Sequence, residues 1–110
     1  MKFNLNQQDL QKSLNYCQGV IEKRSTLPIL SNVLLDASSS KLTITATDLD
    51  LIFIHKISNV EILEEGKTTT SSSIMYDIVR KFSSGKKINF SSVGENKIHL
   101  ESEKSDFNLN

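Results

Sequence analysis

The chain is poor in the residues that cross-link, stiffen or anchor a protein: it holds one cysteine, one proline and no tryptophan among 110 residues. The lone cysteine, Cys17, excludes an internal disulfide and suits a reducing compartment. No apolar run approaches the length of a membrane span, and the opening residues 1–6 are too short and polar for a signal peptide. We therefore expect a cytoplasmic protein with no membrane partner.

An excess of charge of either sign is also missing. Thirteen basic and thirteen acidic residues cancel, whereas a dedicated, tight nucleic-acid binder usually carries a basic surplus. The balance leaves room for weak nucleic-acid contact through a local patch. At this length the chain forms one domain, residues 1–110, with one core.

The signatures of catalysis are absent as well. The chain contains no Gly-x-Ser-x-Gly elbow, no Walker loop, no Gly-x-Gly-x-x-Gly and no Cys-x-x-Cys. His55 and His99 are far apart and sit in strand patterns. Asp48 and Asp50 have the spacing of two metal ligands on one strand face, but Asp more often shapes a turn through nearby amides. We expect no catalytic residue, no metal and no cofactor.

What the sequence does contain is one element order stated twice: strand, helix, three strands. The first helix spans about 7–21, with Asn6 as its cap, and the second about 74–82, with Ser73 as its cap. An apolar face recurs along the first helix at Leu10, Leu14, Cys17 and Ile21. The strands are expected at 2–6, 30–37, 42–47, 51–63 with a break near 58–59, 67–72, 87–93, 97–103 and 106–110.

This order predicts an α+β fold. Neither the amphipathic helix nor the sheet of one unit can bury its apolar side alone. Packing two units together therefore gives two helices in one layer and two antiparallel sheets in the other. The run Leu30–Ala37 is mostly apolar, so we expect this strand to be buried on both faces.

The only proline, Pro28, ends the first helix and forms a rigid corner before the next strand. It belongs to Arg24–Leu35, which reads Arg-Ser-Thr-Leu-Pro-Ile-Leu-Ser-Asn-Val-Leu-Leu. Leu42–Asp50 follows, ending in Thr-Asp-Leu-Asp, and Met1–Phe3 and Gly66–Thr69 fit the same pattern. Together these segments resemble the first domain of the bacterial DNA polymerase III β subunit, the sliding clamp. The resemblance covers all 110 residues and about a third of the usual length of that family.

The resemblance implies a DNA-clamp fold and a non-catalytic role. Clamps are processivity factors: two three-domain chains form a ring that encircles duplex DNA and tethers DNA polymerase III, itself a DNA-directed DNA polymerase and nucleotidyltransferase. It implies as partners double-stranded DNA, a second clamp subunit in a head-to-tail homodimer, the polymerase and the clamp loader. In clamps the polymerase and the clamp loader bind chiefly to later domains, which are absent here. The chain ends inside a strand pattern with no stop signal, so we interpret it as a truncation of a longer chain: either its separate N-terminal domain or the product of a broken gene.

The polar face of the first helix is a candidate DNA-contacting surface. It is formed by Gln8, Gln11, Lys12, Asn15 and Gln18. Such a face is usually only solvated, but in clamps the equivalent helix lines the channel. A sliding channel needs weak phosphate contact without base readout. Arg24, at the end of this helix, is the best candidate, and Lys12 lies on the face itself. Arg80 and Lys81 are weaker candidates, because basic residues late in a helix also stabilise its dipole.

The second helix has more apolar positions than one sheet needs. Met75, Val79 and Phe82 form one stripe, and Ile74 and Ile78 widen it. Phe107 and Leu109 lie on the terminal strand, at a sheet edge where exposed apolar groups invite pairing. All of these residues could be ordinary core. The resemblance favours a subunit interface made of Ile74, Ile78, Phe82, Phe107 and Leu109.

Two other functions stay open. One is a stand-alone interaction module that binds proteins through its apolar sheet edge by strand addition. The other is a small hydrolase that uses His55 or His99 with one of the many serines.

Overall fold

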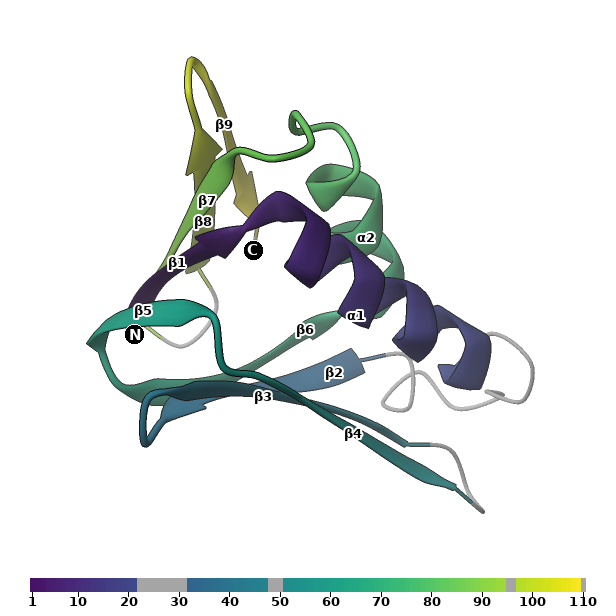
Figure 1. The fold of residues 1–110 in the computed structure, drawn as a ribbon. Helices are drawn as coiled ribbons and strands as arrows, with labels where there is room; N and C mark the ends of the chain where they lie inside the picture. The colour runs from purple at the N-terminus through teal and green to yellow at the C-terminus, as the bar shows by residue number, and fades with distance from the viewer. Residues whose placement is uncertain (22–31, 48–50, 95–96, 110) are drawn as a thin grey trace.

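The computed structural model describes residues 1–21, 32–47, 51–94 and 97–109, which form two helices and nine strands (Figure 1). The Pro28 corner, Arg24, Asp48 and Asp50 lie outside the described residues. The α+β class and the two helix-containing units are confirmed, and the first unit has four strands after its helix where three were expected. The expected strand at 51–63 is two strands, as its break near 58–59 indicated.

The first strand runs straight into the first helix. β1 (Lys2–Asn6) is followed directly by α1 (Gln7–Ile21), as predicted. The predicted cap is also confirmed, because the Asn6 side-chain oxygen accepts a hydrogen bond from the Gln8 amide at 2.9 Å. The apolar face buries Leu10, Leu14 and Cys17.

Three strands then form a meander: β2 (Asn32–Ser38), β3 (Lys41–Thr47) and β4 (Ile52–Ile57). Between β2 and β3 the chain turns through Ser39 and Ser40, whose φ values of 54° and 64° suit a tight hairpin. The expectation that β2 is buried on both faces is wrong. Every second residue of β2 is fully buried and the others are only half-buried, because the helices cover one face of this sheet.

The chain changes sheets after β4. β5 (Val60–Glu64) pairs with β1, and β6 (Gly66–Ser71) pairs with β2. One sheet has the order β5-β1-β7-β8-β9 and the other β4-β3-β2-β6. The expectation that each unit keeps its own sheet is therefore wrong in detail. The first strand of each unit adds to the sheet of the other unit, so the two units interlock.

The second helix begins and ends earlier than predicted. α2 spans Ser72–Val79, and its cap is Ser71 rather than Ser73: the Ser71 hydroxyl accepts from the Ile74 amide at 3.3 Å. Ser71 takes the cap because it is the extended last residue of β6, whereas Ser73 is already helical. Phe82 follows the helix in a turn, with its amide bonded to the Val79 carbonyl at 3.2 Å.

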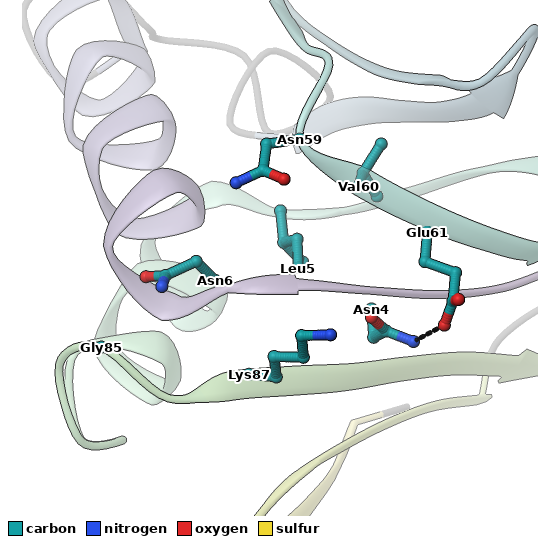
Figure 2. Close-up of a pocket in the computed structure, with 8 residues that line it drawn as sticks. All are labelled: Asn4, Leu5, Asn6, Asn59, Val60, Glu61, Gly85 and Lys87. Atoms are coloured by element: carbon teal, nitrogen blue, oxygen red, sulfur yellow. Dashed lines mark hydrogen bonds between the residues drawn. The ribbon is translucent and has the colours of Figure 1, made fainter.

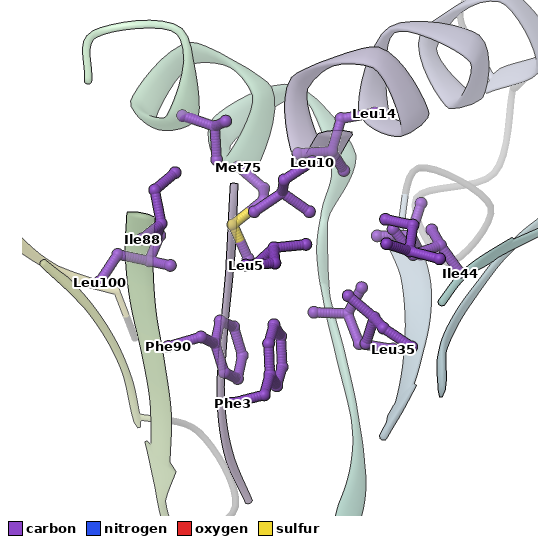
Figure 3. Close-up of a cluster of buried hydrophobic side chains, with 14 of the residues drawn as sticks. Phe3, Leu5, Leu10, Leu14, Leu35, Ile44, Met75, Ile88, Phe90 and Leu100 are labelled. Atoms are coloured by element: carbon purple, nitrogen blue, oxygen red, sulfur yellow. The ribbon is translucent and has the colours of Figure 1, made fainter. Parts of the chain in front are cut away.

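The last three strands are an antiparallel meander close to the predicted bounds: β7 (Lys87–Val93), β8 (Lys97–Ser102) and β9 (Ser105–Leu109). In Figure 1, α1 and α2 lie side by side and the two sheets diverge on the other side of the core. Figure 3 shows that core, where Phe3 and Phe90 stack with ring centroids 4.5 Å apart below Leu5 and Met75. One core thus joins both helices to both sheets.

Candidate nucleic-acid and domain interfaces

The predicted polar face of α1 splits into two parts. Gln8, Lys12 and Asn15 are exposed, whereas Gln11 and Gln18 are half-buried. Gln18 accepts a hydrogen bond from the hydroxyl of Ser72 on α2 at 3.0 Å. Only part of the predicted face is therefore free to meet a ligand, and the rest turns toward neighbouring groups.

The seam between the helices also contains a residue that the helical pattern did not single out. Gln7 is almost fully buried, and its side-chain amide donates to the Val79 carbonyl at 3.0 Å and to the Gln11 side chain at 2.7 Å. The Val79 carbonyl lies at the end of α2, where a helix leaves carbonyl groups without helical partners. Gln7 thus fixes the spacing of the two helices through a polar contact.

Three of the predicted DNA-contacting residues, Lys12, Arg80 and Lys81, are described by the structure, and all three are exposed on the helices or at their ends. In the described part of the chain Lys12 and Lys81 take part in no ion pair. Arg80 does: its Nη2 lies 3.3 Å from Asp77 Oδ1, and its guanidinium stands 5.7 Å from the Tyr76 ring centroid. The charge of Arg80 is partly balanced on its own helix, so it is the weakest of the three for phosphate contact.

The predicted apolar edge is found on β9, which ends its sheet. Ile74 is 49% exposed, and Ile78, Phe107 and Leu109 are half-buried. Phe82 differs, because it is only 5% exposed and lies in the core. Its ring meets that of Phe107 edge-on, with centroids 5.5 Å apart. Phe82 therefore supports Phe107 from inside the domain.

A second apolar edge lies on β4, at the end of the other sheet, and sequence reasoning missed it. Ile52 and Ile54 are 71% and 56% exposed on one face. On the other face Phe53 and His55 meet Tyr16 of α1, with ring centroids about 6 Å apart. The signal was present in the run Ile52-Phe53-Ile54, which places apolar residues on both faces of one strand.

The hydrolase alternative depends on a histidine near a serine, and the structure provides one such pair. Ser13 Oγ is hydrogen-bonded to His55 Nδ1, but the Ser13 side chain is fully buried and so is not placed to meet a substrate. His99 Nδ1 lies 2.7 Å from Asn108 Oδ1 instead. Within the described ranges, no group of three His, Cys, Asp or Glu residues could hold a metal.

The cavity in Figure 2 has a volume of about 290 Å³ and lies where β5, β1 and the start of β7 meet. Phe3 and Leu5 point into the core, so Asn4 lies on the opposite face of the sheet. Its side-chain amide donates to Glu61 at 2.8 Å. The lining also includes Asn6, Asn59 and Lys87. Leu5 and Val60 give the hollow an apolar part beside these polar groups, and none of the predicted contact residues lines it.

Two ionisable groups of the described residues have displaced pKa values. Burial raises the pKa of the Cys17 thiol to about 11, so the thiol is inert in the folded domain. The pKa of Glu64 is lowered, mainly by its hydrogen bond with the Met1 amino group at 2.8 Å. Neither group belongs to the predicted contact surfaces. No helix among the described residues is long and apolar enough to cross a membrane.

Solved structures similar to this chain are sliding clamps. The crystal structure of the Caulobacter crescentus beta sliding clamp matches with a TM-score of 0.90 and 35% identity, covering 100% of this chain and 29% of that one. The Bartonella birtlesii clamp bound to griselimycin matches with a TM-score of 0.89 and 36% identity, covering 99% and 29%. The fold is therefore that of a sliding-clamp domain.

Sequence comparison identifies the family. Residues 1–110 match the family described as DNA polymerase III beta subunit, N-terminal domain. The Beta sliding clamp of Caulobacter vibrioides is 36% identical over 110 residues, covering 99% of this chain and 29% of the relative. That of Escherichia coli K12 is 34% identical over 109 residues, covering 99% and 30%. The chain belongs to this family, and it spans less than a third of the length of these relatives.

Proposed function

We propose that residues 1–110 are the N-terminal domain of a three-domain processivity factor in DNA replication. In this proposal two chains form a ring that encircles duplex DNA and tethers DNA polymerase III. The match of the whole chain to the N-terminal domain of the family carries the proposal. The two-helix layer, with amides and cations on its exposed surface, supports it.

The helix layer is proposed to face the duplex. Lys12 and Lys81 are exposed and in no ion pair within the described ranges, so their ammonium groups are available to phosphates. Arg80 contributes less because Asp77 is close by, and Arg24 stays a prediction on its sequence position. Contacts of this kind attract the backbone without reading bases, which permits sliding.

The α2–β9 end is proposed to join the second subunit of a head-to-tail homodimer. Ile74, Ile78, Phe107 and Leu109 form its apolar surface, and Phe82 holds Phe107 in place from the core. The open edge of β9 supports this role, because an unpaired edge strand can extend a sheet into a second chain.

The domain is proposed to perform no chemistry of its own. It acts as part of a non-catalytic subunit of the polymerase holoenzyme, in the cytoplasm. Contacts with the polymerase and the clamp loader are assigned to later domains. The alternative is a stand-alone interaction module that binds a partner through an apolar sheet edge, and the openness of both β4 and β9 favours it.

A domain exchange tests the proposal. Residues 1–110 replace the N-terminal domain of the Caulobacter vibrioides relative, and the chimera is assayed with its loader and polymerase on a primed circular template. We expect dimers and processive synthesis, with Arg24→Glu sharply reducing both loading and product length. Lys97→Glu, on an exposed position of β8, serves as the charge-matched control.

The outcome of the domain exchange distinguishes the clamp proposal from the interaction-module alternative. A folded chimera that stays monomeric and supports no synthesis contradicts the clamp proposal and favours the interaction module. A working chimera in which Arg24→Glu behaves like Lys97→Glu removes only the proposed role of Arg24.

A further inference from the structure

The hollow in Figure 2 is built around a buried amide group. Asn4 is only 8% exposed, although it lies on the face of the sheet opposite the core. Its Nδ2 donates to Glu61 Oε1 at 2.8 Å. A side-chain amide can make about four hydrogen bonds, and among the described residues the Asn4 side chain makes this one. Because Asn4 lines the hollow, its remaining donor and acceptor positions are available to a molecule that enters it.

The strand register places two opposite charges around Asn4. β1 is the middle strand: Asn4 pairs with Glu61 of β5, and Asn6 pairs with Lys87 of β7. All four residues line the hollow, and Figure 2 shows Glu61 and Lys87 on opposite sides of Asn4. Both charged side chains are exposed, and neither forms an ion pair within the described ranges. Each charge is therefore available to a group of the opposite sign.

Two further amides and two apolar side chains complete the lining. The Asn6 oxygen caps α1, which leaves the Asn6 Nδ2 as a donor next to the ammonium group of Lys87. Asn59 makes no side-chain hydrogen bond with the part of the chain that the structure describes. Leu5 and Val60 supply the apolar part. Donors, an acceptor carboxylate and apolar surface thus converge on one small space.

We propose that the hollow binds a carboxylate carried beside an N–H donor, as in an α-amino acid or in the C-terminal residue of a peptide. The carboxylate meets Lys87 and the Asn6 amide, and the N–H group meets Glu61 and the oxygen of Asn4. A small apolar side chain fits against the apolar part of the lining. The volume of about 290 Å³ is just under the range of about 300–1,000 Å³ of drug-sized ligand sites, so the ligand is small.

Such a site is independent of the proposed replication function, because none of its residues belongs to the predicted DNA or subunit surfaces. NMR titration of the ¹⁵N-labelled chain at neutral pH tests it, with valine, N-acetylvaline, the dipeptide glycylvaline, valinamide and sodium acetate as probes. We expect valine to shift the side-chain amide signals of Asn4, Asn6 and Asn59 saturably, with a Kd on the order of 1 mM. Valinamide, which has no carboxylate, and acetate, which has no N–H group, should bind at least about tenfold more weakly.

The comparison of valine with glycylvaline distinguishes two sources of the same chemistry. Tighter binding of glycylvaline identifies the ligand as the end of a peptide chain. Tighter binding of valine identifies it as a free amino acid.

Two variants that remove one charge each, and a matched control, identify the contacts. Lys87→Gln should weaken the binding of valine, N-acetylvaline and glycylvaline by about tenfold or more. Glu61→Gln keeps an oxygen for the Asn4 amide but loses the charge that meets an ammonium group, so it should weaken valine far more than N-acetylvaline. Lys41→Gln, at an exposed position of β3 in the other sheet, should change nothing. The backbone amide spectrum checks that each variant is folded.

Three results would overturn the proposal. The side-chain amides of the hollow could show no saturable shift with any carboxylate probe up to about 50 mM. Acetate could give the same shifts as valine at the same concentrations, which would mean an adventitious ion only. A folded Lys87→Gln variant could bind valine and glycylvaline as tightly as the unaltered chain. The processivity of the chimera is measured separately, so this site and the replication function can fail independently.

Discussion

At one end of this domain a helix is tied to an edge strand by two packed phenylalanine rings, one of them buried. At the other end the buried contact is a hydrogen bond, and the ring contacts of Tyr16 are partly exposed. Phe82, just past α2, is buried and meets Phe107 of β9. Ser13 of α1, fully buried, bonds to the half-buried His55 of β4, and Tyr16 covers that pair only partly. The two ends hold corresponding places in the repeated unit, yet one is apolar inside and the other polar.

The two ends are expected to differ in how much they contribute to the free energy of unfolding. Burying a large ring contributes more free energy than one hydrogen bond exchanged with water. We therefore expect the α2–β9 end to be the more strongly held and the α1–β4 end to open more readily. Both ends expose apolar surface, and they differ in the buried contacts beneath that surface.

The largest effect is expected for Phe82→Ala. Removing a buried ring leaves a cavity and loses its transfer free energy, so the free energy of unfolding should fall by about 3–5 kcal/mol. Phe53→Ala, the partly exposed ring at the β4 end, should cost only about 1 kcal/mol. Urea titration of both variants measures the two values. Equal losses would show that the two ends are equally buried in solution.

The next effect concerns the Cys17 thiol on the buried face of α1. Its burial and its pKa of about 11 leave little thiolate at pH 8, so a thiol reagent should label the folded chain at least about a hundredfold more slowly than the urea-unfolded chain. Labelling kinetics check this value. Fast labelling of the folded chain at low reagent would mean that α1 detaches easily from the core.

The smallest effect is expected for Ser13→Ala. Because His55 is only half-buried, water can replace its lost partner, and the lost hydrogen bond should cost about 0.5–1.5 kcal/mol, or about 4–8 °C in Tm for each kcal/mol. Thermal melts measure it, with Ser91→Ala on β7 as a half-buried serine control. A loss as large as that of Phe82→Ala would contradict the expected difference in stability between the two ends.

The local pattern predicted many features of this fold correctly. The bounds of β1, α1 and β7 are those expected, and Asn6 caps α1 as predicted. These features depend on residues close in sequence: alternation along a strand, an apolar stripe along a helix, and a side chain that bonds an amide two residues on. The Ser71 cap was missed by two residues, because several serines in a row offer equivalent hydroxyls.

The contact surfaces were only partly predictable. The exposure of Ile74 and the edge position of Phe107 were expected from the excess of apolar residues, whereas the burial of Phe82 was not distinguished from theirs. The β4 edge was missed because a strand is an edge only when no other strand lies beside it. That condition depends on the arrangement of both sheets, and the apolar run Ile52-Phe53-Ile54 is equally typical of a strand that is buried on both faces.

Local sequence patterns predict the elements and the faces they bury, and the resemblance predicts the family. Tertiary packing sets the pairing of β1 with β7 and of β6 with β2, the contacts of Gln7 and Gln18 between the helices, and the positions of β4 and β9 at the ends of their sheets. The hydrophobic periodicity of a helix or strand indicates which of its side chains face water and which face protein, because the two kinds alternate regularly along one element. The periodicity does not indicate which distant segment packs against the buried face. Many strands have equally apolar faces, and only the packing of all elements together selects among them.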